Sequence, residues 1–127
     1  MPSDTKFVRI SRTIGKDQIV DELIISFTHD IEIPAMIPRI PPTGKYIELP
    51  IVVIMKFKGN KIAHEHIYWD QASLLKQLGL LDHSTTTNNQ LPIIGIEQSK
   101  KLELLSLSTQ KKTQKKKAME TFAKAKT

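Results

Sequence analysis

The chain has 127 residues, which is enough for one domain with a modest core and too few for two. It contains no cysteine, which excludes disulfides, thiolate nucleophiles and cysteine-based zinc sites. Residues 1–99 carry ten Lys/Arg against eleven Asp/Glu, a net of −1, whereas residues 100–127 carry nine Lys against two Glu, a net of +7. The excess of positive charge therefore lies in the C-terminal end, and it is no evidence for a basic binding surface on the folded part.

Two alternating segments open the chain. Residues 5–15 alternate apolar and polar side chains, and residues 19–33 are rich in β-branched and aromatic ones. The Gly-Lys-Asp between them is typical of a hairpin turn, so we predict two paired antiparallel strands.

An irregular loop is predicted next, because residues 34–42 hold four prolines. Residues 45–58 and 61–69 then form a second predicted hairpin around Gly59-Asn60. Pro50 indicates a bulge or an edge within the third strand, and Gly44 before that strand is expected to supply a positive backbone angle.

The hydrophobic period changes to that of a helix at Asp70, a plausible N-cap. The helix is marked by four leucines: Leu74, Leu75, Leu78 and Leu81. We assign residues 1–82 to a sheet domain with this helix, residues 83–109 to a linker and a short helix, and residues 110–127 to a mobile lysine-rich tail. The predicted class is α+β, a strongly curved antiparallel sheet with C-terminal helices.

Several short motifs now occur in order: Thr28-His29, residues 42–44 (Pro-Thr-Gly), Lys61-Ile62, Trp69-Asp70 and residues 77–79 (Gln-Leu-Gly). In this order they resemble the SnoaL-like, polyketide-cyclase-related branch of the nuclear transport factor two-like superfamily, over roughly residues 5–82. The resemblance implies a cone-shaped, cystatin-like roll that binds a small apolar or polycyclic ligand and forms a homodimer. It also implies N-terminal helices, which we expect to be missing here, since the first strand begins almost at Met1.

Pleat alternation divides the last predicted strand between two faces. Ile62, His64, His66 and Tyr68 are predicted on one face, and Ala63, Glu65, Ile67 and Trp69 on the other. The pair His64 and His66 is the best candidate for a metal site, but a role on a solvated or dimer-facing surface is favoured, and we assign no metal and no cofactor.

An interpretation as an acid–base site rests on the face that carries Glu65, Ile67 and Trp69. In the polyketide cyclases this strand supplies an acidic base, and the resemblance puts that position on Ile67, which cannot accept a proton. Glu65, one pleat earlier, is the candidate replacement, with His29 as orienter or acid. Trp69, Ile67 and Thr28 are the candidate ligand-pocket residues. The alternative for Glu65 is a structural pairing with a lysine or a backbone amide.

Two functional hypotheses follow. The first is a small-molecule-binding domain, with cyclase- or isomerase-like proton abstraction by Glu65. The second is a non-catalytic dimerisation module that has lost the closing helices and the acid. We expect a cytoplasmic protein without membrane contact, since no signal sequence or apolar span is visible. The lysine-rich end holds one aromatic residue, Phe122, so a solvated tail is favoured over nucleic-acid binding.

Overall fold

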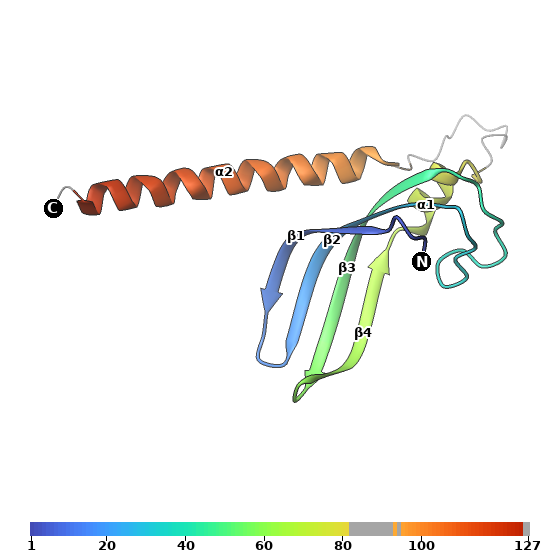
Figure 1. Cartoon of the computed structure of the whole chain (residues 1–127), viewed down its shortest axis with the longest axis horizontal. Coiled ribbons are helices and arrows are strands. Elements are labelled where there is room, and N and C mark those ends of the chain that lie inside the picture. Colours follow the sequence, from blue (N-terminus) through green and yellow to red (C-terminus); the bar gives the residue numbers. More distant parts are fainter. Residues whose placement is uncertain (82–92, 94, 126–127) are drawn as a thin grey trace.

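The computed structural model describes residues 1–81, 93 and 95–125. Its elements are β1 (Lys6–Ile14), β2 (Gln18–Thr28), β3 (Tyr46–Lys58), β4 (Lys61–Trp69), α1 (Gln71–Leu78) and α2 (Glu97–Ala125). The strands form one antiparallel sheet in the order β1-β2-β3-β4. Figure 1 shows the strands bending over α1 and the loop beside it, while α2 extends away from the sheet. The predicted α+β class with a curved antiparallel sheet is confirmed.

Both predicted hairpins are present. The β1–β2 turn is closed by the Gly15 amide, which donates to the Gln18 carbonyl at 2.7 Å. In the β3–β4 turn Gly59 takes a φ of 60°, a left-handed angle that glycine adopts without steric cost. Gly44 has a φ of 69° before β3, as predicted. These turns fix the register of the strands that they join.

The register sorts the sheet into two faces, because directly paired residues point the same way. We call one the core face; on β3 it carries Ile47, Leu49, Ile51, Val53 and Met55. We call the other the outer face; on β3 it carries Tyr46, Glu48, Pro50, Val52, Ile54 and Lys56. In β4, Glu65, Ile67 and Trp69 pair with core-face residues, and His64, His66 and Tyr68 pair with outer-face residues.

The hydrophobic core covers only one end of the core face. Helix α1 and the proline-rich loop pack there, and the cluster comprises Ile25, Phe27, Ile33, Ile37, Ile47, Leu49, Ile51, Val53, Leu74 and Leu78. Among the described residues, no helix or strand packs over the hairpin end of the same face. The sheet therefore has a closed half next to α1 and an open half near the two turns.

Helix α1 is fixed at both ends. The Asp70 carboxylate accepts hydrogen bonds from the Ala72 and Ser73 amides, as an N-cap does. The helix ends at Leu78 rather than Leu81, because Gly79 takes a left-handed φ of 73° and its amide bonds to the carbonyls of the last turn. The predicted cap is thus present, and the predicted helix is one turn too long.

Gln77 joins α1 to the sheet beyond the end of β4. Its side-chain amide donates to the Glu48 carbonyl at 2.8 Å, and its oxygen accepts from the Glu48 amide at 3.0 Å. The pairing of β3 with β4 begins at Ile51, so Pro50 lies where β3 has no neighbouring strand on that side. Pro50 needs no ladder donor there, and the local edge that it predicted is present.

Two predictions about the strands were wrong. Strand β2 ends at Thr28, not near residue 33, because the His29 carbonyl accepts from the Thr43 and Gly44 amides, which turns the chain into the loop. Ile62 lies on the core face, opposite Phe57, because the β3–β4 register shifts between Lys56 and Phe57. A bulge of this kind reverses the alternation of all residues beyond it.

Helix α2 is longer than predicted. It runs without a break from Glu97 to Ala125, across the predicted boundary between residues 109 and 110. Its lysines, glutamines and alanines are good helix formers, so a helix forms with little packing. The hydroxyls of Thr109, Thr113 and Thr121 bond to carbonyls four residues earlier along it. Most of the predicted linker lies outside the described residues. No described helix is long and apolar enough to cross a membrane.

Candidate functional site

One row of side chains crosses all four strands at the border between the closed and the open half of the core face. In this row Arg12 of β1 pairs with Asp21 of β2, Asp21 with Val53 of β3, and Val53 with Ile67 of β4. Asp21 and Val53 are buried, whereas Ile67 remains 51% exposed. The row therefore joins an ionic end on β1 to an apolar end on β4.

Arg12 and Asp21 form a side-on ion pair. The Arg12 Nε and Nη2 atoms donate to the two oxygens of Asp21, each at 2.6 Å. The Asp21 carboxylate is 4% exposed, so both of its oxygens depend on this one partner. The hydrogen bonds from Arg12 hold the pKa of Asp21 below its ordinary value, against the opposite effect of burial. The pair was missed at the sequence level, because nothing in the spacing of the two residues identifies them as partners.

Because the pKa of Asp21 is lowered in the folded chain, the free energy of unfolding depends on pH. A carboxylate whose pKa is lower in the folded chain contributes stability above its unfolded pKa and loses that contribution as the pH falls through the folded value. We expect the free energy of unfolding to decrease between about pH 5 and pH 2, and to decrease less for Asp21→Asn. Urea unfolding at several pH values measures this. The control Asp17→Asn, in an exposed turn, should retain the wild-type pH dependence; an equally steep profile for Asp21→Asn would contradict the assignment.

Trp69 and Glu65 lie on either side of Ile67 on the core face. Trp69 pairs with Ile51 and packs against the core cluster at the border between the closed and the open half. Glu65 pairs with Met55 near the hairpin end; it is exposed and has no hydrogen bond or ion pair among the described residues. Both oxygens of Asp21 are bonded to Arg12, so Glu65 is the carboxylate of this face that has no hydrogen-bond partner among the described residues.

His29 is a buried structural junction. Its ring Nδ1 lies 3.1 Å from the Thr43 hydroxyl and accepts from the Thr43 amide at 3.3 Å. An accepting Nδ1 leaves the proton on Nε2, which is buried without a partner among the described residues. The backbone of His29 also bonds to Thr43, Gly44 and Lys45. His29 therefore closes the loop onto the sheet.

The structure does not bring all the predicted site residues together. Thr28, which precedes His29, pairs with Tyr46, whereas Glu65 pairs with Met55, nine positions further along β3. At about 3.3 Å per residue the two ends are roughly 30 Å apart along the strand. Thr28 also points to the outer face, away from Ile67 and Trp69. Glu65, Ile67 and Trp69 form one surface, and Thr28 and His29 do not belong to it.

His64 and His66 lie on the outer face, as predicted. Their rings are stacked, with centroids 4.9 Å apart and planes inclined by 27°. Both are exposed. Among the described residues no group of three or more His, Cys, Asp or Glu is arranged around a common point.

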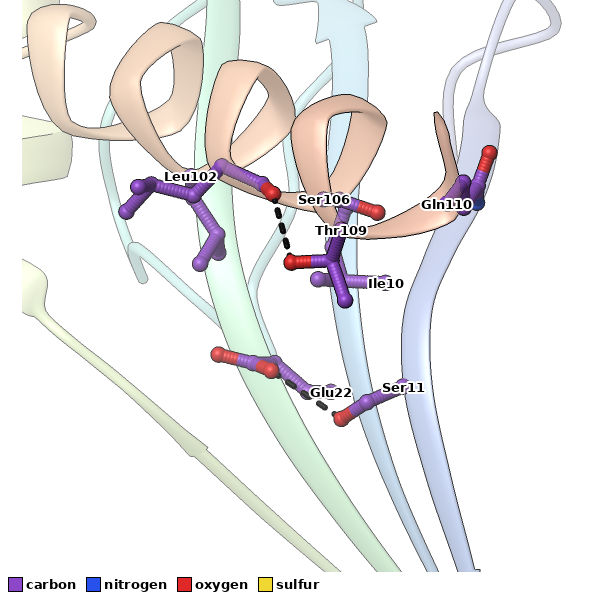
Figure 2. Close-up of a pocket in the computed structure, with 8 residues that line it drawn as sticks. Ile10, Ser11, Glu22, Leu102, Ser106, Thr109 and Gln110 are labelled. Carbon is purple, nitrogen blue, oxygen red and sulfur yellow. Dashed lines mark hydrogen bonds between the residues drawn. The ribbon is translucent and has the colours of Figure 1, made fainter. Parts of the chain in front are cut away.

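A cavity of about 290 Å³ lies elsewhere, between α2 and the outer face of β1 and β2. Figure 2 shows Leu102, Ser106 and Thr109 of α2 facing the strand residues across this space. Its lining comprises Ile10, Ser11, Glu22, Leu102, Leu105, Ser106, Thr109 and Gln110. The Ser11 hydroxyl donates to Glu22 at 3.0 Å on its floor. None of the residues predicted to line a ligand pocket contributes to it.

Comparison with solved structures places the fold. TsrD from Streptomyces laurentii is 20% identical to this chain; the match covers 61% of this chain and 55% of TsrD, with a TM-score of 0.55. AclR from Streptomyces galilaeus, described as a "putative hydroxylase", is 22% identical, with 62% of this chain and 56% of AclR covered and a TM-score of 0.52. A "Putative SnoaL-like polyketide cyclase" from Jannaschia sp. CCS1 is 14% identical, with 61% and 51% covered and a TM-score of 0.52.

These matches confirm the SnoaL-like fold that the ordered motifs predicted. The chain spans little more than half the length of each of these proteins. No protein-family model matches the sequence, and no curated protein matches it.

Proposed function

We propose that the chain binds a small, largely apolar molecule on the open half of the core face. The observation that carries this proposal is the Arg12–Asp21 pair, fixed in the same row as the apolar side chains of Val53 and Ile67. Of the five N–H donors of a guanidinium, two bind Asp21, which leaves three for an external acceptor. A charged group held in one geometry by a buried carboxylate loses little further entropy when it binds a ligand.

The surroundings of Arg12 define the class of ligand. Val53 and Ile67 continue the row of Arg12 across β3 and β4, and Met55 lies in the next row towards the hairpin turn. The ring of Trp69 borders this surface on the side of α1. Such a surface fits a flat, ring-containing molecule with a carboxylate or a polarised carbonyl oxygen at one end. The oxygen accepts from Arg12 while the rings cover Ile67 and Met55, beside the buried Val53.

Trp69 is the single tryptophan of the chain, so its fluorescence reports binding on this face. Titration with anthraquinone-2-carboxylate should quench it, and the matched carboxamide should bind about tenfold or more weakly, since it lacks the charge that pairs with Arg12. The double variant Arg12→Leu/Asp21→Leu removes the ion pair without leaving a buried charge. It should lose most of the preference for the carboxylate, with Arg9 left as the remaining cation on this face.

The control for this titration is Lys56→Leu, which removes a positive charge from the outer face. It should retain the wild-type preference for the carboxylate. A double variant that keeps the preference, or a titration without quenching of Trp69, would contradict the proposal.

A catalytic role for Glu65 is a separate part of the proposal. Its free carboxylate lies on the same face as Ile67, one pleat away, where it could remove a proton next to the carbonyl of a bound ring. Deuterium exchange of 2-tetralone in D2O, followed by NMR, tests this. We expect faster exchange with the wild-type chain than in buffer, and no acceleration by Glu65→Gln. Equal rates for the two proteins would exclude Glu65 as the base and leave the binding proposal intact.

A second candidate function, a dimerisation module, is favoured by the outer face. Tyr46, Val52 and Tyr68 are exposed there on adjacent strands. We propose that two copies associate through this surface. Sedimentation of the wild-type chain should give twice the monomer mass, and Val52→Glu should give the monomer. A monomeric wild-type chain would exclude this candidate.

A further inference from the structure

The outer face of β4 carries, beside Tyr68 of the proposed dimer surface, a pair of imidazoles to which neither proposed function assigns a role. His64 and His66 are two residues apart on one strand, so both rings project from the same face. Their centroids are 4.9 Å apart and their planes nearly parallel. Both side chains are exposed and can rotate without disturbing the core.

We propose that His64 and His66 chelate one transition-metal ion of the class that favours imidazole, such as Ni²⁺, Cu²⁺ or Zn²⁺. A nitrogen binds such an ion at about 2.0–2.1 Å, so two ligands on one ion lie roughly 3 Å apart. Rings whose centroids are 4.9 Å apart reach this separation when they turn their edges towards each other. The chain supplies two ligands, and water or an added ligand fills the remaining positions.

The charges around the pair permit a cation. Lys56 pairs with His64 across the strands, but its ammonium group lies 3.5 Å from the Asp17 carboxylate in the neighbouring hairpin turn. The partner of His66 is Ile54, and the next residue on this face is Tyr68; neither side chain adds a positive charge. Lys58 and Lys61 pair with each other on the same face beyond the bulge, so the positive charges lie towards the hairpin turn, and Lys56 among them is partly neutralised by Asp17.

Calorimetric titration of the full chain with Ni²⁺, in a buffer that does not bind metals, tests the site. We expect one ion per chain. His64→Asn and His66→Asn should each lower the affinity by about tenfold or more, because the second imidazole acts at a high effective concentration once the first is bound. His83→Asn, which removes a histidine outside the described residues, is the matched control and should bind as the wild type does.

Paramagnetic broadening gives a second, independent measurement. Substoichiometric Ni²⁺ or Cu²⁺ should broaden the ring signals of His64 and His66 and leave the buried ring of His29 sharp. An affinity that His83→Asn lowers as much as His64→Asn does, or single variants that bind as tightly as the wild type, would overturn the proposal. Because the site lies on the opposite face from Arg12 and Trp69, these results are independent of the proposed ligand site.

Discussion

Phe27→Ala should lower the free energy of unfolding by about 3–5 kcal/mol. Phe27 is fully buried on the core face of β2, paired with Ile47, and lies under α1 and the proline-rich loop. Removing the ring takes away its transfer free energy and leaves a cavity that the bent sheet cannot fill by moving. Urea unfolding followed by circular dichroism measures the difference.

Phe7→Ala is the matched control. Phe7 lies on the core face of β1, opposite Ile25, but it is 59% exposed because it lies outside the part that α1 covers. Its removal should change stability by no more than about 0.5 kcal/mol. If the two variants lost equal stability, the inference that α1 and the loop cover β2 and β3 but leave β1 uncovered would be wrong.

Leu74→Ala should cost about 2–5 kcal/mol. Leu74 is fully buried on α1 and belongs to the cluster against which Trp69 packs. Since α1 is the one helix that packs on the core face among the described residues, loosening it should also expose Trp69. We expect a red shift of the Trp69 emission in the folded variant, together with a lower midpoint of unfolding.

Leu104→Ala provides the comparison on α2. Leu104 is 67% exposed, so its replacement should leave both the unfolding midpoint and the Trp69 emission unchanged. A loss of stability as large as that of Leu74→Ala would mean that α2, rather than α1, holds the sheet in its bent form.

Local patterns were sufficient for most of the fold. Gly59-Asn60, the alternation in β3 and the leucine spacing after Asp70 each act over a few residues, so the hairpin, the strand and the helix could be predicted. The same alternation correctly separated Glu65, Ile67 and Trp69 from His64, His66 and Tyr68. It failed at Ile62, because a bulge depends on the partner strand and has no signal in a single strand.

The ionic part of the candidate site could not be predicted. Arg12 and Asp21 are nine residues apart, and their pairing depends on a bulge between Arg9 and Ser11 that shifts the β1–β2 register. His29 and Glu65 lie near opposite ends of β3. The alternation of side chains tells which face a residue is on, but not how far along the strand it lies, so this separation could not be predicted. The length of α2 was also not predicted, because its C-terminal part has few apolar residues to bury and the helix there does not depend on packing.

Methyl NMR during a titration with anthraquinone-2-carboxylate distinguishes the two sheet faces most directly. Val52 and Val53 are neighbours on β3 that point to opposite faces. Ligand binding beside Arg12 should shift the methyl signals of Val53 and Ile67 and leave those of Val52 and Ile54 in place. Shifts at Val52 and Ile54 without shifts at Val53 and Ile67 would show that the ligand binds the outer face, and the core face could then no longer be regarded as the binding surface.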